Sequence, residues 1–303
     1  MKVGLLINLT EIPQKPVGDY LASVAKQAEQ ASFSTIAVPD HLSLKPESLA
    51  WMHKDENTPL VSDYLEAYSV LAYIAASTKR IRLTTMVSGI ALRSPAVLVK
   101  TADTLDALSN GRAGLGLGAS PNFGADEHAR MGLPFPSASE RVSRLEEVLK
   151  IAMQLWSGED KPFDGTYYHL TSTIGNPLYV QRPHPPILIG GNGNRMLRLM
   201  AQYADIVSIG FGGGLDDLRA KLETLQDYCQ QVNRPYTDIQ KTTPVAPILK
   251  DGVLDTATIE YMHSLAALGI DEVTINYPND PERFDQLTNS FMPLIENLVT
   301  TGR

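Results

Sequence analysis

One β/α unit can be read directly in residues 185–193, Pro185-Pro186-Ile187-Leu188-Ile189-Gly190-Gly191-Asn192-Gly193. Residues 187–189 form a short apolar run typical of a buried strand, and a segment of helical period follows the glycines. Glycines let backbone N–H groups turn toward an anion, and the N-terminus of the next helix adds a favourable field. We therefore predict a strand, a phosphate-binding turn and a helix, with a plain glycine turn as the alternative.

The same alternation of a short apolar strand with a longer helical segment recurs along the chain, which is typical of a parallel sheet. The expected strands are Val3–Ile7, Ile36–Val38, Leu83–Val87, Ala113–Leu117, Ile187–Ile189, Ile206–Ile209, Thr243–Ile248 and Glu272–Ile275. Eight such units without a linker favour one (β/α)8 TIM barrel spanning residues 1–303 over two domains. The long connections 42–60, 120–137 and 167–186 are expected to rim the catalytic mouth at its C-terminal face.

Three helices have clear sequence signals. Asp19 is expected to cap a helix with an apolar face, and Ser139-Glu140 is expected to open another. A third runs from Pro95 to Leu108 and ends at Gly111. These helices supply the outer layer that a parallel barrel requires.

Composition narrows the classes of function. Lys and Arg total 26 against 34 Asp and Glu, giving a net charge of −8, so nucleic acid and membrane surfaces are not expected partners. A small-molecule substrate is favoured instead. The only cysteine, Cys229, excludes an internal disulfide and fits a reducing, cytoplasmic compartment. No apolar run approaches the roughly 20 residues that span a bilayer.

Asp40 and His41 end the second expected strand, and barrel enzymes build their active sites at strand ends. A histidine there can donate or accept a proton near neutral pH, and the neighbouring Asp40 can fix its tautomer. The pair is therefore a candidate catalytic site. The alternative is a turn in which Asp40 caps the backbone and His41 is a surface residue.

The fourth expected strand ends in Gly116-Leu117-Gly118-Ala119-Ser120, small residues that let a flat ring or phosphate approach the backbone. A tight strand exit is the alternative. The stretch lacks the third glycine and the acidic residue of a dinucleotide fingerprint. The six histidines have no metal-ligand spacing, so no metal site is expected. Glu66 and Glu127 are interpreted as solvated or capping groups.

Several motifs resemble the bacterial luciferase-like family. They are Asp40-His41, residues 79–83 with Met86-Val87, residues 105–112 leading into 116–118, Glu140-Arg141 with residues 145–147, residues 155–158, residues 163–168 and residues 185–191. They occur in the family's order over residues 1 to about 210. With Glu66-Ala67-Tyr68, the set is most similar to the deazaflavin branch, which uses coenzyme F420.

This resemblance implies a (β/α)8 barrel that binds coenzyme F420, or alternatively FMN, and carries out two-electron chemistry at the ring. It implies that His41 is the acid or base, that Asp40 orients it, and that Met86-Val87 is a strand bulge with a non-prolyl cis peptide behind the ring. The two glycine loops would flank the ring and tail, and Arg195 would be a charge partner for the tail. The residues implied to bind the cofactor are Asp40, His41, Met86, Val87, Gly118, Ala119, Ser120, Gly190, Gly191, Asn192, Gly193 and Arg195.

The leading expectation is hydride transfer between the deazaflavin and a small organic substrate. The alternative is an FMN-dependent monooxygenase that uses oxygen and reduced flavin from a partner reductase, and a third is a catalytically silent binding barrel. The resemblance also implies a homodimer.

The chain departs from the family pattern at one position that bears on the substrate. Members that oxidise sugar phosphates or alcohols carry a glutamate after the fourth strand, where this chain has Ser120-Pro121. Alcohol oxidation of that kind is therefore in doubt. Glu11 and Glu127 are expected near the mouth, and the segment with Trp51 and His53 is expected to face the substrate.

Overall fold

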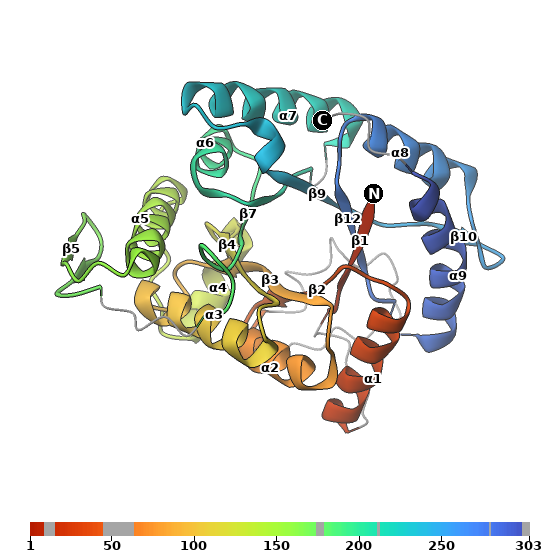
Figure 1. Ribbon diagram of the computed structural model, residues 1–303, viewed down its shortest axis with the longest axis horizontal. Helices are drawn as coiled ribbons and strands as arrows, with labels where there is room; N and C mark the ends of the chain where they lie inside the picture. Colours follow the sequence, from red (N-terminus) through yellow and green to blue (C-terminus); the bar gives the residue numbers. More distant parts are fainter. Residues whose placement is uncertain (9–15, 45–63, 174–178, 211–212, 279, 299–303) are drawn as a thin grey trace.

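A computed structural model describes residues 1–8, 16–44, 64–173, 179–210, 213–278 and 280–298. Eight parallel strands close into a barrel in the order β1-β12-β9-β8-β7-β4-β3-β2 (Figure 1). These strands are β1 (Lys2–Leu6), β2 (Thr35–Asp40), β3 (Arg82–Gly89), β4 (Ala113–Gly118), β7 (Ile187–Gly190), β8 (Ile206–Ser208), β9 (Gln240–Val245) and β12 (Glu272–Asn276). The predicted (β/α)8 barrel is confirmed.

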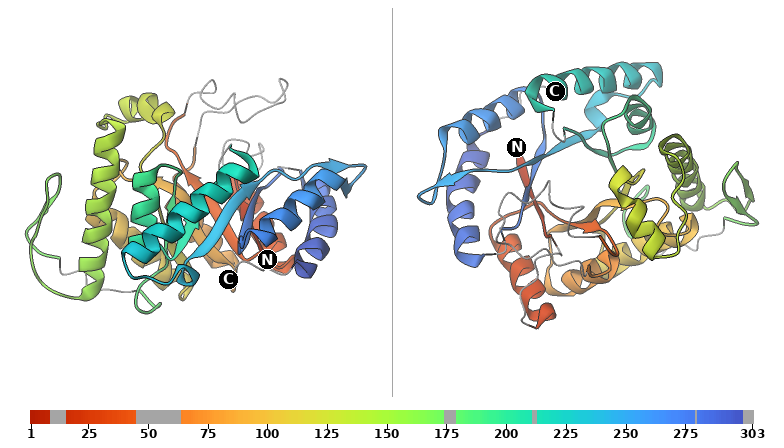
Figure 2. Two further views of the ribbon diagram at one scale, coloured as in Figure 1. Left: turned by 90° about the horizontal axis from the view of Figure 1, so that it is seen from above. Right: turned by 180° about the vertical axis from the view of Figure 1, so that it is seen from behind.

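Helices surround the strands on the outside of the barrel, except for the short helix Ala125–Arg130, which lies over the strand ends (Figure 2). They are α1 (Val17–Gln30), α2 (Ala67–Ser77), α3 (Pro95–Ser109), α4 (Ala125–Arg130), α5 (Ala138–Ser157), α6 (Asn194–Tyr203), α7 (Gly214–Gln231), α8 (Thr256–Ala267) and α9 (Pro281–Asn297). Two short turns of 3-10 helix are η3 (Asn122–Gly124), between β4 and α4, and η4 (Tyr236–Asp238), between α7 and β9. Two small hairpins lie at the periphery, β5 (Phe163–Asp164) with β6 (His169–Leu170), and β10 (Leu249–Lys250) with β11 (Val253–Leu254).

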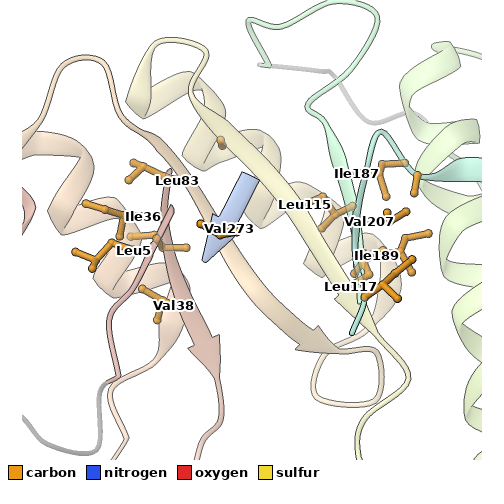
Figure 3. Packing of buried hydrophobic residues seen from close by; sticks show 14 of the residues in the cluster. Leu5, Ile36, Val38, Leu83, Leu115, Leu117, Ile187, Ile189, Val207 and Val273 are labelled. Carbon is orange, nitrogen blue, oxygen red and sulfur yellow. The ribbon is translucent and has the colours of Figure 1, made fainter. Parts of the chain in front are cut away.

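The core lies between the barrel strands and the helices. Aliphatic side chains on successive strands form one buried cluster with the apolar helix faces, as Figure 3 shows for Leu5, Ile36, Leu115, Ile189 and Val273. Each fully buried side chain of this size contributes roughly 1.5–3 kcal/mol of transfer free energy. Each strand of a parallel barrel is covered by side chains of the barrel interior on one face and by helices on the other. Its sequence is therefore a short apolar run.

The N-terminal end of the barrel is closed by a polar network around Glu272, the first residue of β12. Its carboxylate accepts hydrogen bonds from Ser34 Oγ at 2.8 Å and Gln240 Nε2 at 3.3 Å, and it pairs with Arg82 at 2.8 Å. Since barrel enzymes work at the opposite end, we interpret this network as structural.

Several boundaries differ from the sequence expectations. β9 begins at Gln240, three residues before the expected start, because Lys241 is buried with its Nζ 3.3 Å from Asp271 Oδ2. Helix α1 begins at Val17, which places Asp19 in its first turn, and Ser137 caps α5 by accepting from Glu140 N. The expected long loop 120–137 contains η3 and α4.

Helix α3 ends as expected. Asn110 and Gly111 follow its last residue with φ of 56° and 82°, the left-handed conformation that terminates helices. Across the part of the chain that the structure describes, no helix combines the length and apolarity needed to cross a membrane.

Candidate active site at the C-terminal ends of the strands

Asp40 lies at the end of β2 and is buried, but its partner is Arg93 from the segment after β3. Arg93 donates both terminal nitrogens to the Asp40 carboxylate, with Nη2 3.1 Å from Oδ1. Asp40 was expected to orient His41. The structure corrects that assignment, because the Asp40 carboxylate is engaged by Arg93 while a different carboxylate contacts His41.

Arg93 also bonds Glu66, which precedes α2. The Glu66 carboxylate caps that helix by accepting from Ser69 N at 2.7 Å and Tyr68 N at 3.3 Å, so the expected capping role is confirmed. Burial acts against the Arg93 charge, but the hydrogen bonds and charges of Asp40 and Glu66 prevail and raise the pKa of Arg93. This cluster fastens β2, α2 and the segment after β3 together beside His41.

We predict that Arg93→Met leaves the buried Asp40 carboxylate without its counter-ion. Removing one partner of a buried ion pair costs about 3–5 kcal/mol of the free energy of unfolding. The matched control is Lys150→Met, which removes an exposed pair with Glu146 and is expected to cost less than about 1 kcal/mol. Urea unfolding of both variants measures the difference, and equal costs would contradict this description of the cluster.

His41 follows β2, and its Nδ1 lies 3.0 Å from Glu127 Oε2. Glu127 belongs to α4 and is 2% exposed. Its other oxygen accepts from Leu42 N and from Ser43 N, the latter at 3.2 Å. The expectation that Glu127 is solvated is therefore wrong, because it is buried against the segment that carries His41.

The ionisation of Glu127 follows from these contacts. Burial acts to raise the pKa of the carboxyl, but the His41 hydrogen bond and charge and the two backbone donors outweigh it and lower the pKa. Since the pKa is depressed in the folded protein, the carboxylate contributes stability above the unfolded value of 4.5 and loses it as pH falls through the folded pKa.

We therefore expect wild-type protein and Glu127→Gln to differ in free energy of unfolding at pH values above 4.5, where the Glu127 carboxylate is ionised. The difference should shrink on acidification below 4.5, where the wild-type carboxylate takes up its proton. Urea unfolding from about pH 7 to about pH 3 checks the sign of this dependence. A difference that grows as the pH falls below 4.5 would refute it.

The expected bulge in β3 is present. The Met86–Val87 peptide is cis and non-prolyl, and the register of β3 against β4 shifts between Thr84 and Ser88. A Cβ built on Gly118 would lie 2.5 Å from Val87 Cγ2, and one on Gly190 would lie 3.0 Å from Val87 Cγ1. The ends of β3, β4 and β7 thus meet at Val87, and the absence of side chains at Gly118 and Gly190 permits this contact.

Ser120 follows β4 with φ 61°, and its Oγ is buried. Among the described residues no hydrogen-bond partner for this Oγ is found. A Cβ built on Gly89 would lie 2.4 Å from Ser120 Oγ, so the absence of a side chain at Gly89 makes room for this hydroxyl. A buried hydroxyl without a partner costs about 1–3 kcal/mol, which a polar ligand group at this position would recover.

The loop of residues 190–193 is a strand-to-helix turn between β7 and α6. Gly191 has φ 150°, Gly193 precedes α6 with open space around its Cβ position, and Asn192 Oδ1 accepts from Gly210 N at 3.1 Å. Backbone N–H groups at the start of α6 are therefore available to an anion. Arg195, expected to pair with such an anion, instead donates to Ser139 and Ser143 of α5 at 2.9–3.0 Å.

A cavity of about 250 Å³ lies between the segments after β3 and β4 and the first half of α5. Arg93, Arg144 and Tyr168 line it, together with the apolar side chains of Leu92 and Pro134. Ligand sites for drug-sized molecules are commonly about 300–1,000 Å³, so this cavity has room for part of a ligand. Its wall includes the Arg93 side chain that fixes Asp40.

The structure therefore places His41, Val87, Gly118, Ser120 and the 190–193 loop at the C-terminal end of the barrel. The Arg195 guanidinium is hydrogen-bonded to α5, and its pairing with a cofactor tail stays a prediction. Glu11, Trp51 and His53 lie outside the described residues. Arg93 is a functional candidate that the sequence reasoning omitted, although its position just after β3 is a signal for it. Nothing in the sequence indicated that Gly89 makes room for the Ser120 hydroxyl.

A (β/α)8 barrel with a histidine and glycine turns at its strand ends defines an enzyme class that handles a small molecule there. The profile of the luciferase-like monooxygenase family matches residues 1–281. The chain belongs to that family, and it is an oxidoreductase.

Individual relatives agree with this membership. An uncharacterised protein of Mycobacterium tuberculosis is 28% identical over 268 residues, which cover 84% of this chain and 83% of the relative. An F420-dependent glucose-6-phosphate dehydrogenase of Kineococcus radiotolerans is 32% identical over 198 residues, covering 65% of this chain and 53% of that enzyme. The structure of the coenzyme F420 dependent tetrahydromethanopterin reductase from Methanopyrus kandleri has the same fold, with a TM-score of 0.74, 17% identity and 99% of each chain covered.

Proposed function

We propose that this chain is an oxidoreductase that uses coenzyme F420 and transfers a hydride between the deazaflavin ring and a small organic substrate. The observation that carries the proposal is that His41 follows Asp40, which pairs with Ser88 directly after the Met86–Val87 bulge of β3, at the end of the barrel where barrel enzymes react. Similarity to an F420-dependent dehydrogenase supports the choice of coenzyme.

The residues present fit such a coenzyme. The small residues Gly118 and Gly190 around Val87 give a ring access to the backbone, and Ser120 Oγ is a buried hydroxyl in need of a partner. The start of α6, with open space at Gly193, suits the anionic tail. When bound, the deazaflavin supplies a ring carbon that accepts or donates a hydride.

The chain's own groups supply the proton chemistry in this proposal. His41 exchanges a proton with the substrate, and the Asp40–Arg93 pair holds the end of β2 in place. Arg93 also presents its charge to the neighbouring cavity, where part of the substrate can bind. With Ser120-Pro121 after β4, no carboxylate follows that strand directly, so sugar-phosphate oxidation is not the substrate class we assign.

The second candidate is an FMN-dependent monooxygenase supplied by a separate flavin reductase, and the description of the matching family favours it. Two assays separate the candidates. Anaerobic mixing with oxidised F420 and a panel of hydride donors, or with reduced F420 and acceptors, should change the coenzyme absorbance if our proposal holds. Oxygen consumption with reduced FMN, and no F420 turnover, would instead select the monooxygenase.

The homodimer and the cytoplasmic location stay predictions. The single, buried Cys229 is compatible with a reducing compartment. Light scattering of the purified chain measures its mass in solution and so tests the dimer.

A further inference from the structure

Both carboxylate oxygens of Glu127 contact the segment that begins with His41. Oε2 lies 3.0 Å from His41 Nδ1, and Oε1 accepts from Leu42 N and Ser43 N. A carboxylate held by two backbone donors cannot rotate away from the ring without losing them. We propose that Glu127 positions His41 by keeping the ring proton of neutral His41 on Nδ1, so that Nε2 is the atom that exchanges a proton with the substrate.

The charge on Glu127 decides the direction of this hydrogen bond. Its lowered pKa makes it a carboxylate at neutral pH, and a carboxylate only accepts hydrogen bonds. His41 Nδ1 must therefore donate, whether the ring is neutral or protonated. In the neutral ring the lone pair is then on Nε2.

Asp40 is the other carboxylate that could position His41, but its contacts exclude it from this role. The Asp40 side chain is fully buried and forms an ion pair with Arg93, which also pairs with Glu66. Arg130, also on α4, donates to Ser43 Oγ at 3.2 Å. Glu127 is thus the carboxylate that offsets the charge of a protonated His41.

The ring of His41 is packed on its faces and edges but remains accessible. Tyr64 meets it edge-on at a centroid distance of 5.6 Å, and Phe123 lies at 6.1 Å. The side chain keeps 21% of its surface exposed. The hydrogen bond of Nδ1 to Glu127 leaves Nε2 as the ring nitrogen that we assign to the substrate.

The proton balance follows directly. In the oxidising direction the substrate would lose a proton from its O–H or N–H bond to the Nε2 lone pair and a hydride from the adjacent C–H bond to the deazaflavin, so that the substrate is oxidised and the coenzyme reduced by two electrons. The imidazolium formed would keep its Nδ1–H directed at Glu127. In the other direction Nε2 returns the proton. This inference rests on the proposed function only for the identity of the reaction, because the tautomer is a property of the protein alone.

The test is the tautomer of His41 in protein labelled with ¹⁵N in its histidine rings. Long-range ¹H–¹⁵N spectra at about pH 8.5, well above the ordinary histidine pKa of about 6.5, show which ring nitrogen carries the proton. The chain has six histidines, so loss of one set of signals in His41→Gln assigns the ring. We expect a protonated Nδ1 and an unprotonated Nε2.

The variant Glu127→Leu should lose the fixed Nδ1–H pattern. The matched control is Glu29→Leu, because Glu29 also accepts from backbone N–H groups, those of residues 79–81, but contacts no histidine. The control should leave the His41 spectrum unchanged. With an active coenzyme pair, Glu127→Leu should also lower kcat about 10²-fold while the coenzyme Kd changes less than about threefold.

A proton on Nε2 in neutral wild-type His41 overturns the proposal, and so does an unchanged Nδ1–H pattern in Glu127→Leu. If that variant does not fold, the wild-type spectrum alone decides. Failure of the chain to turn over F420 would refute the proposed function but leave the tautomer result standing.

Discussion

Replacing His41 by alanine is expected to lower kcat about 10²–10⁴-fold, the range that a positioned proton donor or acceptor contributes. The coenzyme Kd should change little, because the glycine turns and the Val87 bulge that we assign to the ring remain in place. Steady-state kinetics with the F420 couple, together with a binding titration, separate these two effects.

His263 offers the matched control for this variant. It lies on the exposed side of α8, far along the chain from β2, so His263→Ala should retain wild-type kcat. Full turnover by His41→Ala with normal coenzyme binding would remove His41 from the mechanism. It would also remove the functional meaning of the Glu127 contact.

Replacing Gly116 by alanine should unfold the barrel or cost about 4 kcal/mol or more of the free energy of unfolding, a loss reserved for severe core defects. A Cβ at this position would lie 1.9 Å from the carbonyl oxygen of Thr85 and 2.8 Å from its carbon. Both atoms are backbone of the adjacent β3, so relief requires moving a barrel strand. Thermal and urea unfolding measure the loss.

Gly124→Ala is the control for Gly116→Ala. Its φ is −73°, and the nearest atom to a Cβ there is at 3.6 Å, an ordinary contact. The change should stay within about 1 kcal/mol of wild type. If Gly116→Ala is equally harmless, the close approach of β3 and β4 at Thr85 is not as the structure has it.

The barrel was predictable because strands that are buried on both faces consist mostly of apolar residues, which can be recognised in the sequence. The run Ile187–Ile189 was assigned correctly as a strand, and β7 extends it by one residue. β9 shows the limit of this reasoning. It opens with Gln240 and Lys241, and a buried lysine is recognisable only once its partners Asp271 and Tyr236 are in place, the latter with its ring 4.7 Å from Nζ.

The site was predictable where it depends on strand ends. His41 and the Met86–Val87 bulge follow from the position of β2 and from the family resemblance. The hydrogen-bond partners of these residues were not predictable from the sequence, because the bond between His41 and Glu127 joins residues 86 positions apart. Because Asp40 is adjacent to His41 in the sequence, a pair between these two residues was expected. The structure shows that Asp40 pairs with Arg93 instead.

The preference of this chain for its coenzyme is measured by a binding titration of the purified chain with coenzyme F420 and, separately, with FMN, followed by fluorescence. We predict a Kd for F420 of about 1 μM or tighter, near 8 kcal/mol of binding free energy, and FMN binding at least about tenfold weaker. Tighter binding of FMN than of F420 would contradict the account and select the monooxygenase.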